Sequence, residues 1–337
     1  MTIRVGVNGF GRIGRNFYRA ASKSGADLEI VAVNDLGSID TMAHLLAFDS
    51  VHGRLPGEVR TTSDGIAVDG RTLKVLQVRD PSALPWKQLG VDVVVESTGI
   101  FTDRAAAAAH LSAGAPFVIV SAPSSGADAT FVVGVNDDEF DPEKHQVVSN
   151  ASCTTNCFVP LVKVLDDAFG VEHGLMTTVH SYTGDQMIVD GPHKDLRRAR
   201  AAAVNIVPTS TGAARATGLV LQAMKGRLDG TSLRVPTPDG SITDLVAVLK
   251  KPATVDEINT AYRDAASSGP LKGILEYSEA PLVSSDIIGN PYSCIFDSEL
   301  TMSMGTLVKV LGWYDNEWGY SNRLVDLALI VGAANRK

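Results

Sequence analysis

The residues with the clearest chemical potential are a cysteine and a histidine in two hydroxyl-rich segments. Cys153 lies within residues 151–157 (ASCTTNC), and His180 lies within residues 178–183 (TVHSYT). A thiolate can add to a carbonyl carbon, and a histidine can accept the thiol proton and later return it. Because a free thiol has a pKa near ~8.5, we expect the site to lower that pKa. The two segments predict covalent catalysis on a carbonyl group.

Ser152 is the residue expected to position the thiol. Serine favours the N-cap of a helix, and apolar residues recur at helical spacing through residues 153–169. A helix that begins at Cys153 would hold the sulfur at the positive end of the helix dipole, which favours a thiolate. Pro160 lies inside this helix, and we expect a kink there because proline removes a backbone donor.

Two other roles for Cys153 remain open on residue type alone. It could be a small buried apolar side chain, the usual fate of an intracellular cysteine, or a metal ligand together with Cys157. Its polar neighbours disfavour burial, and two cysteines four residues apart without a further Cys/His cluster make a poor zinc site. We therefore favour a nucleophile at Cys153, a packed side chain at Cys157, no assigned role for Cys294 and no metal. His180 alone would more often be structural, so its predicted role depends on its hydroxyl-bearing neighbours.

A glycine-rich loop near the N-terminus predicts a dinucleotide site. Residues 9–14 (GFGRIG) join an expected buried strand over residues 3–8 to an expected helix over residues 15–24. Such a loop is weak evidence alone, but here a second strand at residues 28–34 ends at Asp35, about 20 residues further on. The glycines allow a tight turn and a close approach of pyrophosphate to the helix N-terminus. Asp35 can bind ribose hydroxyls and would repel a 2′-phosphate, which favours NAD over NADP.

Size, charge and cysteine content limit the possible functions. The 337 residues predict two domains, and the net charge of −8 argues against nucleic acid or an anionic membrane as the main partner. No apolar run reaches the length of a membrane span, and the chain opens into a core strand, so we expect neither a membrane helix nor a signal peptide. Three cysteines are too few for a disulfide framework, which predicts a reducing compartment, most simply the cytoplasm.

The order of expected elements predicts the fold class. Alternating strands and helices in the first half predict an α/β Rossmann domain with a doubly wound parallel sheet, which binds ligands at the carboxyl ends of its strands. From Cys153 onward, longer strands predict an α+β domain with a mixed or antiparallel sheet. A final helix from residue 317 could pack back on the first domain. The expected strands cover residues 91–97, 117–121, 130–135, 146–149, 175–182, 232–235, 243–249 and 306–313, and the expected helices cover residues 102–114, 211–221 and 254–266.

Three further features could bind anions. Residues 193–200 (HKDLRRAR) are strongly basic in an acidic protein. Such a run is usually a solvated helical face, although its arginines could also bind phosphate. Residues 210–214 (STGAA) predict a hydroxyl-bearing helix start, and Arg234 ends an expected strand. Two phosphate-sized sites around one thiol would be consistent with these features.

In chain order, these motifs resemble the type I, phosphorylating glyceraldehyde-3-phosphate dehydrogenases. The resemblance runs from the first strand to the last helix and implies a homotetramer. It also implies an NAD-binding Rossmann domain over residues 1–152, completed by residues 317–337, and a catalytic domain over residues 153–316. The matching segments are residues 8–15 (NGFGRIGR), 34–35 (ND), 96–99 (ESTG), 149–157 (SNASCTTNC), 208–214 (PTSTGAA), 234–236 (RVP) and 313–321 (WYDNEWGYS).

The resemblance implies roles for individual residues. Cys153 matches the family's nucleophile, and His180 matches its acid/base partner. The predicted cofactor site takes Gly9, Gly11 and Gly14 from the glycine-rich loop, and the resemblance adds Arg12, Ile13, Asp35, Arg79, Ser121 and Asn316, with the Asn316 amide near the nicotinamide. Positions that match the inorganic-phosphate site are Ser152, Thr154, Thr211 and Gly212, and those around the substrate's own phosphate are Thr183, Arg198 and Arg234. Leu36 and Pro192 resemble the residues of NAD-linked members.

The implied activity is the glycolytic oxidation of glyceraldehyde 3-phosphate by NAD and inorganic phosphate, through a cysteine thioester, to 1,3-bisphosphoglycerate. Erythrose-4-phosphate dehydrogenase is a near alternative with the same thiol. The hydroxyls of residues 209–212 favour the first activity because they provide a site for inorganic phosphate. A non-catalytic NAD-binding or RNA-binding protein is an alternative of another class, and the negative charge and the intact thiol argue against it.

Overall fold

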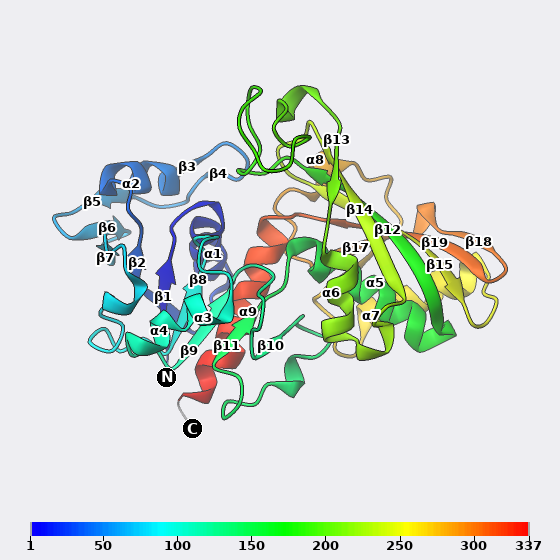
Figure 1. Cartoon of the computed structure of the whole chain (residues 1–337), viewed down its shortest axis with the longest axis horizontal. Coiled ribbons are helices and arrows are strands. Elements are labelled where there is room, and N and C mark those ends of the chain that lie inside the picture. The colour runs from blue at the N-terminus through cyan, green and yellow to red at the C-terminus, as the bar shows by residue number, and fades with distance from the viewer. Residues whose placement is uncertain (1, 336–337) are drawn as a thin grey trace. The chain divides into compact units, whose positions relative to one another are not determined.

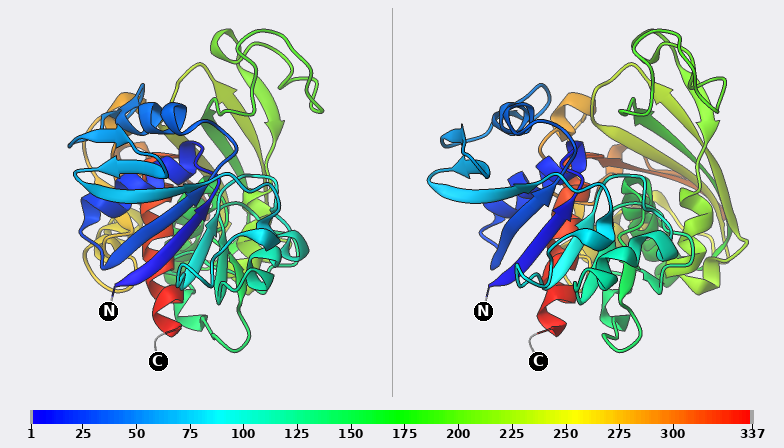
Figure 2. Two further views of the ribbon diagram at one scale, coloured as in Figure 1. Left: turned by 90° about the vertical axis from the view of Figure 1, so that its left-hand side faces the viewer. Right: turned by 60° about the vertical axis from the view of Figure 1, so that its left-hand side comes forward.

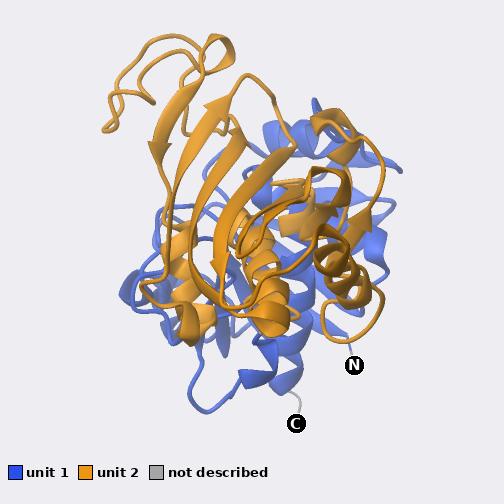
Figure 3. Cartoon of the chain, turned by 90° about the vertical axis from the view of Figure 1, so that its right-hand side faces the viewer, with its two compact units in different colours: residues 1–131, 136–151, 321–337 blue, residues 132–135, 152–320 orange. Residues whose placement is uncertain are grey.

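A computed structural model describes residues 2–335, and these residues form two compact units. Within the described chain, unit 1 comprises residues 2–131, 136–151 and 321–335, and unit 2 comprises residues 132–135 and 152–320 (Figure 3). The last two residues of the expected segment 317–337 lie outside the described residues.

Unit 1 is built on a nine-stranded sheet of described residues, and most of that sheet is parallel. The strands are β1 (Ile3–Asn8), β2 (Leu28–Asn34), β5 (Val59–Thr61), β6 (Gly65–Val68), β7 (Arg71–Leu76), β8 (Val93–Glu96), β9 (Phe117–Val120), β10 (Ala129–Thr130) and β11 (Val147–Ser149). Their order is β10-β11-β9-β8-β1-β2-β7-β6-β5, and only the pairs β7–β6 and β6–β5 are antiparallel. Figure 2 shows β1, β2 and β7 side by side in the parallel part. The predicted doubly wound α/β fold is therefore confirmed.

The parallel strands form because their sequences are continuous apolar runs. Val93, Val94 and Val95 of β8 are fully buried, as expected for a strand that is covered on both faces. The helices of this unit are α1 (Arg12–Ser24), α2 (Ile39–Ala47), α3 (Arg104–Ala107) and α4 (Ala109–Ser112), and a small hairpin joins β3 (Phe48–Asp49) to β4 (Gly53–Arg54) (Figure 1). Gly25 ends α1 in the left-handed region with a φ of 67°.

The last helix, α9 (Trp318–Ala334), contributes most of its length to unit 1. An ideal Cβ on Gly332 would lie 2.4 Å from Cγ2 of Ile3, so only glycine permits this close approach to β1. Just after the helix, the Asn335 side chain donates to Asp92 at 2.9 Å. These contacts hold the C-terminal helix against the parallel sheet.

Unit 2 contains a mixed sheet, as predicted. Its strands are β12 (Val171–Ser181), β13 (Val207–Ser210), β14 (Leu228–Val235), β15 (Ser241–Leu249), β16 (Leu275–Ser278), β17 (Cys294–Asp297), β18 (Met302–Met304) and β19 (Leu307–Tyr314). The main order is β13-β14-β12-β15-β19-β17-β16, in which β12 pairs parallel with β14 and antiparallel with β15. The helices are α5 (Cys153–Phe169), α6 (Ala213–Val220), α7 (Val255–Ser267) and α8 (Ser284–Ile287).

Several local expectations are wrong. Residues 131–135 were expected to extend a strand, but β10 ends at Thr130 and the chain then turns, with Gly134 at a φ of 84°. The alanine-rich helix is divided into α3 and α4 at Ala108. The basic residues 193–200 form a loop with turns and no helix. In contrast, α5 runs through Pro160 as one helix of 17 residues.

No helix among residues 2–335 combines the length and the apolar character needed to span a membrane.

Candidate active site

The cysteine and the histidine predicted from the sequence face each other in unit 2. Cys153 is the first residue of α5, and its Sγ lies 3.4 Å from Nε2 of His180 near the end of β12. Ser152 caps the helix as predicted, because its Oγ accepts a hydrogen bond from the backbone N–H of Thr155 at 3.0 Å. Ala151, just before the cap, has a φ of 55°, a left-handed conformation that is costly for alanine. The turn into α5 therefore presents the thiol to the imidazole.

The hydrogen bonds of His180 define which ring nitrogen carries the proton. Its Nδ1 lies 2.7 Å from the backbone oxygen of Ser181, and a carbonyl oxygen can only accept, so Nδ1 is the protonated nitrogen. Nη1 of Arg234 also lies 3.2 Å from Nδ1, but it donates its two hydrogens to the Ser181 oxygen at 3.1 Å and to Oγ1 of Thr183 at 3.0 Å. Nε2 therefore presents a lone pair to the Cys153 thiol. This arrangement suits a general base that removes the thiol proton.

The electrostatics of this pair correct one expectation. Burial raises the pKa of the Cys153 thiol to about 11, although Arg234 and hydrogen bonds from Thr154 act in the opposite direction. Burial and the adjacent positive charge of Arg234 lower the pKa of His180 to about 3. The expected decrease of the thiol pKa is wrong because the loss of hydration outweighs the effects of Arg234 and the Thr154 hydrogen bonds. At neutral pH the resting site holds a thiol and a neutral imidazole, so the proton moves to Nε2 as the sulfur attacks.

A buried tyrosine lies beneath the pair. The Tyr314 hydroxyl lies 2.9 Å from Oγ1 of Thr154 and 2.8 Å from Oγ1 of Thr178. Its ring meets the His180 ring edge-on, with centroids 5.9 Å apart and an interplanar angle of 74°. Burial raises the pKa of Tyr314, so the phenol stays protonated. The sequence analysis missed this role because Tyr314 comes from β19, far along the chain.

Three residues predicted to surround the substrate phosphate gather beside His180. Register pairs His180 with Arg234 across β12 and β14, and Nη1 of Arg234 donates to Oγ1 of Thr183 at 3.0 Å. Arg198 comes from the irregular loop that follows, and its Nε donates to Oγ1 of Thr209 at 3.0 Å. Two guanidinium groups and a hydroxyl are a suitable donor set for a phosphate group.

An acidic residue that the sequence analysis missed connects these groups. Asp185 accepts a hydrogen bond from the Thr183 hydroxyl, and its Oδ2 lies 2.6 Å from Nη1 of Arg198. Although burial opposes ionisation, the Thr183 hydroxyl and the nearby charges of Arg198 and Arg234 lower the pKa of Asp185. The carboxylate therefore holds part of the donor set in place. Asp185 lies between Thr183 and Arg198 in the sequence, but its hydrogen bonds to both are visible only in the fold.

The residues predicted to bind inorganic phosphate lie at two helix starts. Ser152 and Thr154 belong to the start of α5, while Thr211 and Gly212 precede α6, and these two helices pack together. Gly212 is the N-cap of α6, and Oγ1 of Thr211 accepts the backbone N–H of Ala213 at 3.2 Å. The Thr154 hydroxyl is buried and bonded to Tyr314, whereas Thr211 is partly exposed.

The glycine-rich loop of unit 1 has the spatial properties that a dinucleotide requires. Gly9 has a φ of 93°, and a Cβ there would lie 2.6 Å from the backbone nitrogen of Thr98. A Cβ on Gly14 would lie 2.2 Å from the oxygen of Gly9, so this glycine permits close packing of α1 on the strand end. A Cβ on Gly11 would meet nothing within 4 Å, so the space beside it is open to a ligand. Each glycine thus has a distinct role, as the dinucleotide fingerprint requires.

The remaining predicted cofactor residues of unit 1 follow strand ends or begin α1. Asp35 follows β2, and its carboxylate accepts the backbone N–H groups of Phe10 and Gly37, each at 2.9 Å. Arg12 pairs with Asp49 at 3.1 Å. Burial opposes ionisation of Asp49, but backbone donors from residues 51 and 52 and the Arg12 guanidinium lower its pKa to about 2. Ile13 is in the first turn of α1, Arg79 is exposed in the loop after β7, and Ser121 directly follows β9.

Asn316 is the one predicted cofactor residue in unit 2. Its Oδ1 accepts hydrogen bonds from Oγ of Ser181 at 2.9 Å and from Oγ of Ser241 at 2.6 Å. Two donors on one oxygen fix the orientation of the amide and leave its N–H groups to donate elsewhere. The sequence analysis identified Asn316 but missed both serines, whose separation along the chain gives no local signal.

Known proteins resemble this sequence along nearly the whole chain. Residues 3–104 match the family described as glyceraldehyde 3-phosphate dehydrogenase, NAD binding domain, and residues 152–316 match its C-terminal domain. The chain is 63% identical to glyceraldehyde-3-phosphate dehydrogenase 1 of Streptomyces avermitilis over 332 residues, which cover 98% of this chain and 99% of that protein. The enzymes of the same name from Streptomyces coelicolor and Mycobacterium avium are each 62% identical, with the same coverage.

The chain belongs to the glyceraldehyde-3-phosphate dehydrogenase family. NAD is therefore its cofactor, and the glycine-rich loop fits that cofactor because the space beside Gly11 is open.

The other two cysteines of this family member are buried in unit 2 and unpaired by disulfides. Sγ of Cys157 lies 3.5 Å from the backbone oxygen of Gly312, and a Cβ on that glycine would lie 2.6 Å from Sγ of Cys294. Burial raises the pKa of Cys157 well above its ordinary value, so it is an unreactive packed thiol, as predicted. Cys294 lies in β17, a strand that the sequence analysis did not identify.

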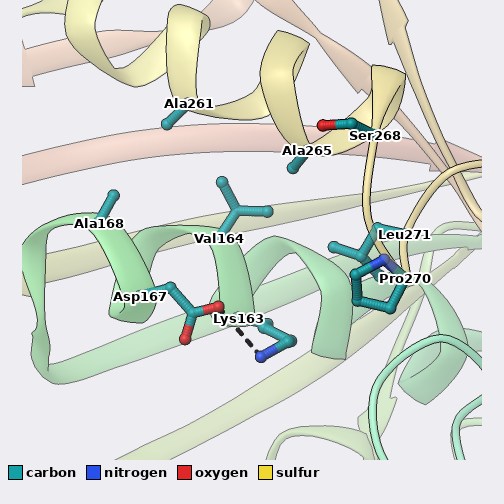
Figure 4. A pocket seen from close by; sticks show the side chains of 9 residues that line it. All are labelled: Lys163, Val164, Asp167, Ala168, Ala261, Ala265, Ser268, Pro270 and Leu271. Carbon is teal, nitrogen blue, oxygen red and sulfur yellow. Dashed lines mark hydrogen bonds and ion pairs between the residues drawn. The ribbon is translucent and has the colours of Figure 1, made fainter.

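A shallow pocket lies away from the thiol, between α5 and α7. It has a volume of about 290 Å³ and is lined by Lys163, Asp167, Ser268 and apolar residues (Figure 4). Lys163 and Asp167 form an ion pair with each other at 3.0 Å, so their charges are already satisfied. We assign no ligand to this pocket.

Proposed function

We propose that the chain oxidises glyceraldehyde 3-phosphate with NAD and inorganic phosphate, through a thioester on Cys153, to give 1,3-bisphosphoglycerate. The observation that carries the proposal is the 3.4 Å contact between Sγ of Cys153 and Nε2 of His180, in a tautomer fixed by Ser181. Arg234 lies against the same histidine, which gives a phosphorylated substrate a place to bind.

The first step is addition of the sulfur to the aldehyde carbon. Nε2 of His180 takes the thiol proton as the carbon–sulfur bond forms, and the aldehyde oxygen becomes the hydroxyl of a hemithioacetal when that proton is returned. The backbone N–H of Cys153, at the helix start, and the protonated imidazole can stabilise the negative oxygen during the addition. Burial and the adjacent charge of Arg234 lower the pKa of His180, so the imidazolium is a strong acid that returns the proton.

The second step converts the hemithioacetal into a thioester. NAD, when bound by the glycine-rich loop and Asp35, would supply a hydride acceptor. His180 removes the hydroxyl proton while the carbon–hydrogen bond breaks, which leaves a carbonyl bonded to sulfur. Inorganic phosphate, held by Ser152, Thr154, Thr211 and Gly212, then attacks this carbonyl, and the carbon–sulfur bond breaks. The departing sulfur takes back a proton from His180, and the acyl phosphate is released.

We also propose that residues 1–152 together with the C-terminal helix form the functional NAD-binding domain, and that residues 153–316 form the catalytic domain. The two compact units, which meet along the chain at residues 151/152 and 320/321, support this assignment, although residues 132–135 and 317–320 belong to unit 2.

A homotetramer is the proposed assembly. Exposed apolar side chains in two regions support this assembly. On the unit 2 sheet, Leu175 is 68% and Leu307 is 42% exposed; in the loop after β12, Ile188 is 87% and Leu196 is 82% exposed. Isolated chains rarely leave so many large apolar side chains in water. Sedimentation equilibrium at micromolar concentration should give four times the chain mass, and a monomer would contradict the proposed assembly.

We propose a cytoplasmic location, which is supported by three cysteines that remain free thiols.

An absorbance assay of NADH formation tests the proposed activity. The purified protein should turn over many times with glyceraldehyde 3-phosphate, NAD and phosphate, arsenate should replace phosphate, and turnover should stop without either anion. Unchanged multiple turnover without an anion would instead favour the erythrose-4-phosphate type of reaction. NAD binding with no reduction of NAD under any condition would favour a non-catalytic binding protein.

A further inference from the structure

A buried row of polar side chains crosses unit 1 at the carboxyl ends of its central strands. Asn34, Asn8 and Glu96 are the last residues of β2, β1 and β8, and the strand registers pair Asn8 with both of the others. Each of the three side chains is at most 5% exposed. Polar residues in the core of a parallel sheet are costly unless all their hydrogen bonds are made, so their place at this edge needs an explanation.

Glu96 is at one end of this row, and both of its oxygens are fully used. Oε1 accepts the backbone N–H and the hydroxyl of Thr98, at 2.8 and 2.5 Å. Oε2 accepts Nδ2 of Asn8 at 2.6 Å and lies 3.0 Å from Nε2 of His110. Within the described chain, Glu96 pairs with no lysine or arginine. Four donors can stabilise a buried carboxylate that has no positively charged partner.

The state of His110 is defined by a third buried residue. The indole nitrogen of Trp86 lies 3.0 Å from Nδ1 of His110, and an indole N–H can only donate. Nδ1 is therefore an acceptor, so the ring is neutral and carries its proton on Nε2, directed at Glu96. Trp86 and His110 are both fully buried, which makes this the fixed inner end of the network.

The row continues from Asn8 toward Asp35 and Arg79. Oδ1 of Asn8 accepts Nδ2 of Asn34 at 2.7 Å. The Asn34 side chain in turn exchanges two hydrogen bonds with the backbone of Val78, each at 2.8 Å. One connected set of hydrogen bonds therefore includes Asn8, Asn34 and Val78, which directly precede Gly9, Asp35 and Arg79 in the chain. It also includes Thr98, against which Gly9 packs.

We propose that Glu96 is a positioning residue for the cofactor. Its carboxylate, held by His110 and Trp86, fixes the relative places of the glycine-rich loop, the Asp35 turn, the Arg79 loop and the Thr98 loop before NAD binds. It does so through Asn8 and Asn34 and touches no reacting atom. The inference rests on the proposed roles of Gly9, Asp35 and Arg79, but it concerns a residue to which the resemblance assigns no role of its own.

The chemistry of Glu96→Gln makes it a specific probe. In glutamine, an NH₂ group replaces one of the two carboxylate oxygens. Each of these oxygens accepts two hydrogen bonds in Glu96, so in either orientation of the amide the NH₂ group faces two other donors. We expect the dissociation constant and the KM for NAD to rise roughly tenfold or more, the scale of a lost hydrogen bond to a charged group. The KM for glyceraldehyde 3-phosphate and the alkylation rate of Cys153 should stay within about twofold, and kcat at saturating NAD within about threefold.

The matched control is Glu29→Gln. Glu29 belongs to β2 of the same sheet, but its side chain is 57% exposed and pairs with Arg4. This variant should bind NAD as the unmodified protein does. Direct titration with NAD, followed by tryptophan fluorescence, gives a readout that does not depend on turnover.

Three outcomes decide the question. A selective loss of NAD affinity in Glu96→Gln supports the proposal. A folded Glu96→Gln whose NAD affinity equals that of the control overturns it, as does an equal loss of affinity for NAD and for glyceraldehyde 3-phosphate.

If Glu96→Gln does not fold, Thr98→Val replaces it, because this change removes only one donor to Oε1. NAD affinity within twofold of the control would then overturn the proposal, and a weaker affinity would support it. Absence of NAD reduction by the unmodified protein would contradict the proposed function instead.

Discussion

The cofactor edge of unit 1 and the thiol site of unit 2 are built in different ways. At the cofactor edge, glycine backbone and neutral hydrogen bonds around a single buried carboxylate define the shape, and the key residues lie one after another at strand ends. At the thiol site, side chains of opposite charge lie close together: the guanidinium groups of Arg234 and Arg198 face the carboxylate of Asp185. Unit 1 therefore contributes a preformed shape, whereas unit 2 contributes reactivity that depends on burial and charge.

Loss of the nucleophile should have the largest effect. Cys153→Ser should lower turnover by roughly a thousandfold or more, because the thioester cannot form, while NAD binding in unit 1 stays unchanged. Steady-state assays and NAD titration measure the two effects separately. Cys294→Ala, which changes a buried thiol outside the reacting pair, should keep activity within about twofold. An active serine variant would refute the assigned role of Cys153.

Removal of the base should have the next largest effect. His180→Asn should lower kcat by roughly 10²–10⁴-fold because it removes the base whose Nε2 lies 3.4 Å from the thiol. The matched control is His173→Asn, an exposed histidine on the same strand.

The pH dependence of alkylation tests the same pair. Because the pKa of Cys153 is raised to about 11, the thiolate is scarce at neutral pH, and its fraction grows as the pH rises toward that value. Labelling by iodoacetamide should therefore accelerate steadily between pH 7 and pH 10, and it should favour Cys153 over the buried Cys157 and Cys294. A plateau below pH 8, or equal labelling of all three thiols, would contradict the electrostatic account.

The preference for NAD over NADP should depend on the Asp35 carboxylate and on two apolar residues, Leu36 and Pro192. Like-charge contact with a 2′-phosphate costs several kcal/mol, so the unmodified enzyme should prefer NAD roughly a hundredfold or more. Asp35→Gly should relieve the repulsion but also weaken NAD binding, because it removes the acceptor for Phe10 and Gly37. Adding Leu36→Thr and Pro192→Ser should raise relative efficiency with NADP further. Equal use of both cofactors by the unmodified enzyme would contradict this assignment.

Substrate recognition should be sensitive to the arginine beside the histidine. Arg234→Gln should raise the KM for glyceraldehyde 3-phosphate roughly 10–100-fold, because a charge-assisted contact to phosphate is lost, and it should leave the KM for NAD within about twofold. Arg215→Gln is a suitable control, since Arg215 is exposed and pairs with Asp229. An unchanged substrate KM in Arg234→Gln would place the substrate phosphate elsewhere.

Two glycine substitutions at the cofactor edge distinguish a loss of NAD affinity from a loss of folding stability. They should have the smallest effect on turnover. Gly11→Ala should change the free energy of unfolding by less than about 1 kcal/mol, because its Cβ meets nothing within 4 Å, yet weaken NAD binding by roughly fivefold or more. Gly14→Ala should destabilise the fold by about 1–3 kcal/mol, because its Cβ would lie 2.2 Å from the Gly9 oxygen. Thermal unfolding and NAD titration distinguish the two results, and equal destabilisation by both would contradict the distinct roles.

The same contrast explains what the sequence could predict. The glycine-rich loop, Asp35 and the Ser152 cap are local patterns, so the Rossmann unit and the start of α5 were predicted correctly. Tyr314, Ser241 and the Glu96 network join segments that are far apart in the chain, so no local pattern indicates their contacts. The sign of the Cys153 pKa shift was also missed, because the degree of burial that controls it exists only in the folded chain.

Trapping of the acyl-enzyme tests the central claim most directly. The protein should be mixed with NAD and glyceraldehyde 3-phosphate without phosphate, quenched in acid, and analysed by intact-protein and peptide mass spectrometry. The account predicts one phosphoglyceroyl group per chain, located on Cys153, formed together with one equivalent of NADH and removed by added phosphate. Continued NADH formation without any adduct, or an adduct on another residue, would contradict it.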